Sequence, residues 1–163
     1  MGRLQADDAF TIKYDKYGNM IYKLAFTYLG KQEDCEDILQ EVFVRLLRKP
    51  PRFRDEEHEK RWILRITVNC CIDLIRKNKK GNSLPLDENI PAVETPEEQD
   101  LLNLVLKLPD KLKAPIHLHY YEGYRVKEIA GILEISVSAV KMRLKRGREM
   151  LKIRIEEEEY GRR

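Results

Sequence analysis

The sequence lacks any apolar run approaching the roughly 18 to 20 residues of a membrane span, and its first residues lack the apolar stretch of a signal peptide. Cysteine is scarce, and Cys35, Cys70 and Cys71 form neither a CxxC pair nor a Cys/His cluster with metal-ligand spacing. These absences argue against a membrane protein, a disulfide-stapled secreted domain and a zinc site. They predict a soluble cytoplasmic chain whose cysteines are reduced core residues, with redox sensing as the open alternative.

Groups suited to catalysis are also few. His58, His117 and His119 are the only histidines, and no P-loop, nucleophile motif or metal cluster accompanies them. His117 and His119 are two apart, so on a helix they cannot share one ligand face. The sequence therefore predicts no enzyme, no cofactor and no metal, and a nucleic-acid enzyme is the least favoured hypothesis.

What the sequence does have is charge, arranged unevenly. Residues 1–80 carry 17 basic and 13 acidic side chains, residues 81–100 carry 6 acidic and no basic ones, and residues 101–163 carry 14 basic and 9 acidic ones. Two basic lobes joined by an acidic segment are typical of a protein that touches a polyanion at two places.

Apolar residues recur at helical spacing nearly everywhere outside residues 78–96. Gly30 predicts the end of a long first helix, Pro50 and Pro51 the end of a second, and a polar loop, 52–59, the approach to a third. The predicted inner stripes are Phe10, Tyr14, Tyr17, Ile21, Leu24 and Tyr28, then Cys35, Ile38, Leu39, Val42, Phe43 and Leu46, then Trp62, Ile63, Ile66, Cys70 and Leu74.

Prolines, a glycine and scattered acids interrupt this periodicity from Asn78 to Pro96, which predicts an extended linker. No segment alternates as a strand would. The predicted fold is therefore all-α, with two small helical domains, 1–80 and 97–163, joined by an extended acidic linker, 81–96.

The C-terminal domain carries a helix-turn-helix pattern after predicted helices near 97–107 and 110–121. A short helix from Val126 to Leu133 is followed by the turn Glu134-Ile135-Ser136 and a longer helix, 137–154. Ser136 is placed to cap the longer helix by accepting the amide of Ala139. Seven basic residues stand against one acid from Lys141 to Ile155, a composition that favours phosphate and guanine contacts in duplex DNA.

Two further surfaces are predicted in the N-terminal domain. Asp37, Gln40 and Glu41 fall within one turn and would repel DNA, so this face is expected to dock on a protein. The third helix is basic, and Trp62 and Asn69 add an aromatic ring and an amide, a mixture suited to unpaired bases. A core anchor is the alternative role for Trp62.

At these residues the chain resembles the σ70 family, and within it the small extracytoplasmic-function type of bacterial RNA polymerase sigma factor. The segment 33–43 (EDCEDILQEVF) resembles the family's core-polymerase-binding motif, and 61–69 (RWILRITVN) with 72–76 (IDLIR) resembles its −10 segment. Glu128-Ile129-Ala130 and 140–146 (VKMRLKR) resemble its −35-binding domain.

The resemblance implies a factor that binds core RNA polymerase and promoter DNA, opens the strands at the −10 element and is held by an anti-sigma factor in many relatives. It implies core-polymerase contacts by Asp37, Gln40 and Glu41, with a 53–60 loop bordering a flipped base. The −10 residues would be Arg61, Trp62, Arg65, Asn69, Arg76 and Lys77, and the −35 residues Ser136, Ser138, Lys141, Arg143, Lys145 and Arg146.

Four residues depart from the family pattern. Glu134 replaces the usual turn glycine, where a positive φ would be strained, and Arg125 replaces a capping Ser or Thr. Met142 and Lys145 make the base-reading surface individual, so no −35 sequence can be copied from a relative. A conventional helix-turn-helix regulator that never meets polymerase is the second hypothesis. In that case the Asp37 face would be ordinary solvated surface.

Overall fold

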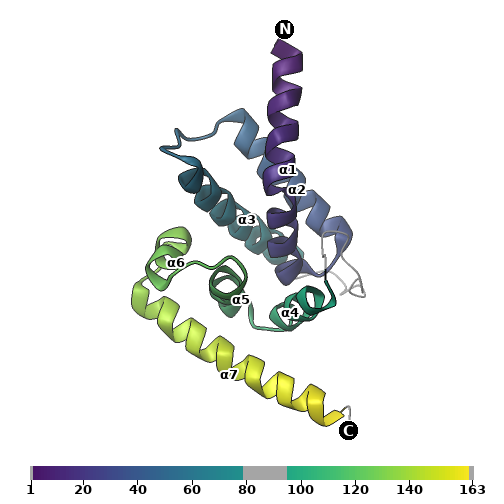
Figure 1. Ribbon diagram of the computed structural model, residues 1–163, viewed down its shortest axis with the longest axis vertical. Coiled ribbons are helices and arrows are strands. Elements are labelled where there is room, and N and C mark those ends of the chain that lie inside the picture. The colour runs from purple at the N-terminus through teal and green to yellow at the C-terminus, as the bar shows by residue number, and fades with distance from the viewer. Residues whose placement is uncertain (1, 79–94, 162–163) are drawn as a thin grey trace. The chain divides into compact units, whose positions relative to one another are not determined.

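The computed structural model describes residues 2–78 and 95–161, and the chain divides into two compact units, Met1–Ala92 and Val93–Arg163. All the described elements are helical, as predicted (Figure 1). They are α1 (Gly2–Leu29), α2 (Gln32–Arg48) and α3 (Glu56–Asn78), then α4 (Pro96–Leu106), α5 (Asp110–Ile116), the π-helical turn η1 (His117–Tyr121), α6 (Val126–Leu133) and α7 (Val137–Gly161). Nearly all of the predicted acidic linker lies outside the described residues.

Helices α1, α2 and α3 pack around one core in the N-terminal unit. The inner stripe predicted for α2 is confirmed in full, since all six of its residues are buried. In α1 the prediction is wrong at one end: Phe10 and Tyr14 are 39% and 44% exposed, whereas burial begins at Tyr17. The two exposed rings still contact the buried Phe43, with centroids 5.5 Å from that of Phe43.

The third helix differs from its prediction in where it begins and which face it buries. It starts at Glu56, inside the segment predicted as loop, because Asp55 Oδ1 accepts the amide of His58 at 2.7 Å and caps the first turn. Of the predicted stripe only Ile63 and Cys70 are buried, and Trp62, Ile66 and Leu74 are half-buried. The remaining core residues are Leu64, Thr67, Val68 and Cys71.

All three cysteines are buried and lie outside any disulfide, as predicted. Burial raises the pKa of the Cys70 thiol above its ordinary value. Because oxidation proceeds through an accessible thiolate, this environment disfavours the redox-sensing alternative.

The C-terminal unit begins with α4, where Thr95 Oγ1 accepts the amide of Glu98 at 3.1 Å and Pro96 occupies the first turn. The Glu98 carboxylate also accepts a hydrogen bond from the Tyr121 hydroxyl, which joins α4 to η1. The predicted helix ending near Tyr121 is α5 continued by the wider π turn. Gly123, with φ of 77°, ends it. Among the described helices, none combines the length and apolarity of a membrane span.

Candidate nucleic-acid interface

The helix-turn-helix has the predicted boundaries around its turn, since α6 ends at Leu133 and α7 begins at Val137, but α7 ends at Gly161, beyond the predicted end at residue 154. Ser136 Oγ accepts the amide of Ala139 at 3.0 Å, as predicted for its cap. Arg125 begins α6 without a capping side chain of its own, but Glu128 Oε1 accepts its amide at 3.0 Å. These local hydrogen bonds stabilise the first turns of α6 and α7.

Glu134 closes α6 in the left-handed conformation, with φ of 56° and ψ of 44°. It is the single non-glycine residue with positive φ in the described part of the chain. A side chain costs about 1 to 2 kcal/mol in this conformation. The strain expected from the missing glycine is therefore present.

We expect Glu134→Gly to stabilise the C-terminal unit by about 1 kcal/mol, because glycine adopts this conformation without a steric penalty. The measurement is the thermal midpoint of the far-ultraviolet circular dichroism signal. The control is Gly123→Ala, which should have the opposite effect. Gly123 has a φ of 77° and open space around it, so the new side chain should destabilise the unit by a similar amount through backbone strain alone. A thermal midpoint lower for Glu134→Gly than for the native chain would contradict the strain inferred at Glu134.

The outer face of α7 is basic and accessible. Val140, Leu144 and Gly147 are buried and form the inner face. Of the predicted −35 residues, Arg143 is half-buried beside that inner face, and the others are exposed: Ser136, Ser138, Lys141, Lys145 and Arg146. The long cationic side chains can thus reach phosphates and base edges without any rearrangement of the C-terminal unit.

Helix α3 presents a second, chemically different face. Trp62, Arg65, Asn69 and Arg76 fall within about 60° of one another around the axis, opposite the buried residues, because a helix turns about 100° per residue. Trp62, Arg65 and Arg61 are half-buried, whereas Asn69, Arg76 and Lys77 are exposed. Arg61 Nε also donates to Glu57 Oε1 at 3.2 Å. A ring, an amide and cations share one helical surface.

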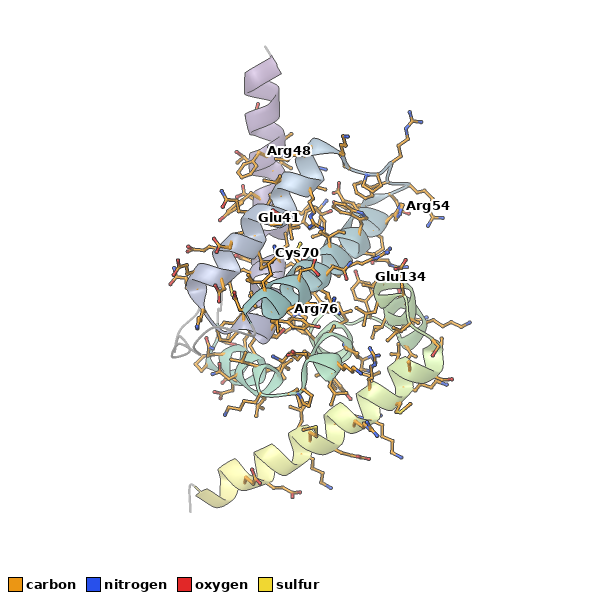
Figure 2. The ribbon with its side chains drawn as sticks, turned by 180° about the vertical axis from the view of Figure 1, so that it is seen from behind. Glu41, Arg48, Arg54, Cys70, Arg76 and Glu134 are labelled. Atoms are coloured by element: carbon orange, nitrogen blue, oxygen red, sulfur yellow. The ribbon has the colours of Figure 1, made fainter. Side chains whose placement is uncertain are left out.

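The segment before α3 folds tightly against this surface. The amide of Arg54 donates to His58 Nδ1 at 3.1 Å. The Phe53 ring stands edge-on to His58 at 5.5 Å and packs against Trp62 at 5.6 Å between centroids. Figure 2 shows Arg54 projecting from this loop. The Phe53 ring therefore supports Trp62, whose side chain is half-buried.

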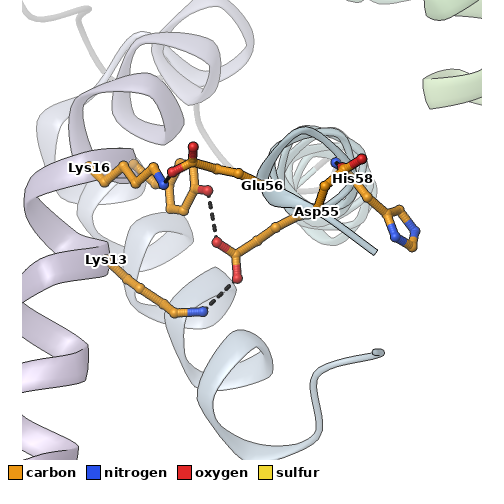
Figure 3. A network of polar contacts seen from close by, with 7 residues as sticks. Lys13, Lys16, Asp55, Glu56 and His58 are labelled. Atoms are coloured by element: carbon orange, nitrogen blue, oxygen red, sulfur yellow. Dashed lines mark hydrogen bonds and ion pairs between the residues drawn. The ribbon is translucent and has the colours of Figure 1, made fainter. Parts of the chain in front are cut away.

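A polar network that no sequence pattern predicted fixes the first turn of α3 to α1. The Glu59 carboxylate accepts hydrogen bonds from Lys13 Nζ at 2.5 Å and from the Tyr17 hydroxyl at 2.8 Å (Figure 3). Lys16 and Glu56 form a more exposed ion pair beside it. Burial raises the pKa of Glu59, but the two hydrogen bonds and the lysine charges outweigh it, so the net pKa is lowered.

Glu59→Gln is expected to destabilise the N-terminal unit by about 1.5 to 3 kcal/mol at neutral pH, the range for hydrogen bonds to a charged group. Because the folded-state pKa of Glu59 is lowered, its contribution is present above the ordinary glutamate pKa and lost as pH falls through the folded value. Urea unfolding followed by Trp62 fluorescence should show a constant difference in unfolding free energy between the native chain and the variant above the ordinary glutamate pKa, and a difference that shrinks as the pH falls below it.

The matched control for that measurement is Glu56→Gln, one turn earlier on the same helix. Its partner Lys16 is exposed, and exposed ion pairs contribute about 0.2 to 1 kcal/mol. An equal loss in both variants would contradict the role given to Glu59.

Helix α2 carries the predicted protein-docking face. Asp37, Gln40 and Glu41 are all exposed on the side opposite its buried stripe. Arg45 Nε donates to Glu41 Oε1 at 3.0 Å, so this carboxylate is partly neutralised within the helix. Figure 2 shows Glu41 on this helix. Within residues 2–78 and 95–161, no three His, Cys, Asp or Glu side chains form a cluster that could hold a metal ion.

Two family models match the chain. Residues 14–81 match sigma-70 region 2, and residues 98–151 match sigma-70 region 4. The chain is 34% identical to the ECF RNA polymerase sigma factor SigW of Bacillus subtilis, in an alignment covering 89% of this chain and 88% of SigW. It is 33% identical to the RNA polymerase sigma factor SigV of the same organism, over 86% and 87% of the two chains.

Solved structures share the fold. The sigma factor RpoE from Bartonella quintana, in complex with the anti-sigma factor NepR, aligns with a TM-score of 0.73 at 18% identity, over 91% of this chain and 97% of that one. CnrH, in complex with the cytosolic domain of CnrY, aligns with a TM-score of 0.64 at 22% identity, over 94% of each chain.

Proposed function

The chain belongs to the sigma-70 family of RNA polymerase sigma factors, within its extracytoplasmic-function type, and we propose how its parts divide the work of promoter recognition. Residues 1–80 bind core polymerase and the melted −10 strand, and residues 97–163 hold the −35 duplex. Residues 81–96 link the two parts. The chain acts in the cytoplasm, where promoter DNA and polymerase are found, and supplies no catalytic group, cofactor or metal of its own.

The observation that carries this proposal is the shared face of Trp62, Arg65, Asn69 and Arg76 on α3. A duplex-binding regulator needs cations and hydrogen-bond donors but no aromatic ring at the surface. A ring braced by Phe53 offers a stacking platform worth about 1 to 3 kcal/mol per unpaired base. That energy offsets the few kcal/mol lost when a base leaves the stack. Strand opening then requires only the binding of unpaired bases and no catalytic group.

Partner binding follows from the two remaining surfaces. The exposed Asp37, Gln40 and Glu41 face of α2 would repel DNA and suits a basic surface on core polymerase. The basic face of α7 suits duplex phosphates and base edges. RpoE, whose fold this chain shares, is seen bound to the anti-sigma factor NepR, which supports an anti-sigma partner here as well.

The direct test is transcription in a purified system. Core polymerase with the chain added should initiate from a subset of genomic promoters, and aligned start sites should share two upstream elements. A conventional regulator would bind duplex DNA but would not direct initiation by core polymerase alone. Absence of transcripts from every genomic promoter would exclude the proposed function.

A further inference from the structure

Among the described side chains of helix α7, one large apolar residue is exposed on an otherwise polar outer surface. Met142 is 55% exposed, and it is the one large hydrophobic residue of α7 that is exposed among the described side chains. At about 100° per residue it points away from the inner face formed by Val140, Leu144 and Gly147. Packing within the C-terminal unit therefore does not explain this methionine.

The surroundings of Met142 indicate what it would meet. Ser138 lies four residues before it and Lys145 three residues after it, so the three side chains share one face and are all exposed. Lys141 and Arg146 flank this face and add positive charge. A methionine bordered by cations is better matched to a polyanion than to the apolar core of a protein interface.

Duplex DNA offers one apolar group to a helix in the major groove, the C5-methyl of thymine. The early residues of a recognition helix contact base edges, and Met142 is in the second turn of α7. Its thioether chain is flexible and polarisable, which suits contact with an isolated methyl group.

We propose that Met142 is a specificity-determining residue that packs against a thymine methyl in the −35 element. The proposal rests on the proposed function, because it assumes that α7 enters the major groove of the −35 duplex. It adds that one base pair of this element is read through an apolar contact, while the neighbouring cations hold phosphates or guanine edges.

The test removes single methyl groups from the DNA. The full chain and core polymerase are bound to a promoter located by start-site mapping, with each −35 thymine on either strand replaced in turn by deoxyuridine. We expect one replacement to weaken binding about fourfold, the effect of one buried methyl-sized group. Met142→Ala should bind the natural promoter about as weakly and should be indifferent to that replacement.

Three variants sharpen the result. Met142→Leu keeps an apolar side chain and should keep the sensitivity to deoxyuridine, whereas Met142→Gln should lose it. Met150→Ala changes the same residue type on the same helix, outside the proposed contact, and should keep it. Since Met142 is exposed, its variants are expected to fold. Met150 is half-buried, so unchanged thermal unfolding is checked for all three variants.

The inference is overturned if the native chain tolerates every replacement, if the −35 element contains no thymine on either strand, or if Met142→Ala keeps the sensitivity. In those cases normal transcription would leave the proposed function standing. Failure to bind or transcribe any promoter would instead overturn both.

Discussion

Gly147→Leu is expected to unfold the C-terminal unit under conditions in which the native chain is folded. Gly147 is buried where α7 packs on α5, and a Cβ there would lie 2.5 Å from Cδ1 and Cγ1 of Ile116. The Ile116 side chain is fully buried, so relieving this contact requires a shift within the core. Overpacking of this kind typically costs about 1 to 3 kcal/mol and occasionally more, and leucine adds three further carbons beyond the first clash.

The two units allow this effect to be localised. Trp62 is the only tryptophan and lies in the N-terminal unit, so its fluorescence reports on that unit, whereas circular dichroism reports on both. In Gly147→Leu we expect an early loss of helical signal with an unchanged Trp62 transition. Binding to −35 duplex should be lost as well, because α7 would no longer be held in place.

Two controls separate overpacking from a general effect of replacing glycine. Gly131→Ala is exposed in α6 with nothing within 4 Å of the new Cβ, and it should stabilise by about 0.5 to 1 kcal/mol. Adding Ile116→Ala to Gly147→Leu should recover part of the lost stability, since the pair is in direct contact. If the helical signal of Gly147→Leu is lost at the same point as that of the native chain, the close packing of α5 on α7 is contradicted.

Asp37→Lys is expected to weaken binding to core polymerase by roughly thirtyfold or more. Loss of one partner from a desolvated charge pair costs about 2 to 5 kcal/mol, and each 1.4 kcal/mol is about a factor of ten. Asp37 is exposed on α2 beside Gln40 and Glu41, so the reversal places a cation at the centre of the proposed docking face. The stability of the free chain should not change.

The matched control is Glu36→Lys. Glu36 is the adjacent residue, is also exposed and undergoes the same change of charge, but it lies about 100° away around the helix. Titration of labelled core polymerase with each variant gives the affinity of that variant for the polymerase. Promoter-directed transcription at a limiting concentration of the variant then checks whether the loss of affinity reduces initiation. Equal losses at positions 36 and 37 would show a general charge effect, and an unaffected Asp37→Lys would place the polymerase contact elsewhere.

Where structure depends on neighbours in the chain, the sequence was sufficient. The buried stripe of α2 and the bounds of α6, its turn and the start of α7 were predicted correctly, because helical periodicity and caps act over three or four residues. Ser136 capping Ala139 and the left-handed Glu134 belong to the same class. The contacts assigned to Asp37, Trp62 and Lys141 stay predictions. Their partners are separate molecules, and helical periodicity and capping residues carry no information about them.

The tertiary structure decided what joins residues far apart in sequence. Glu59 meets Lys13 and Tyr17 across 46 and 42 positions, and the space for Gly147 is limited by Ile116 of another helix. The same packing leaves Phe10 and Tyr14 exposed, although their spacing is that of buried residues. Periodicity shows which face of a helix is apolar, but how far neighbouring helices cover it depends on their lengths and crossing positions.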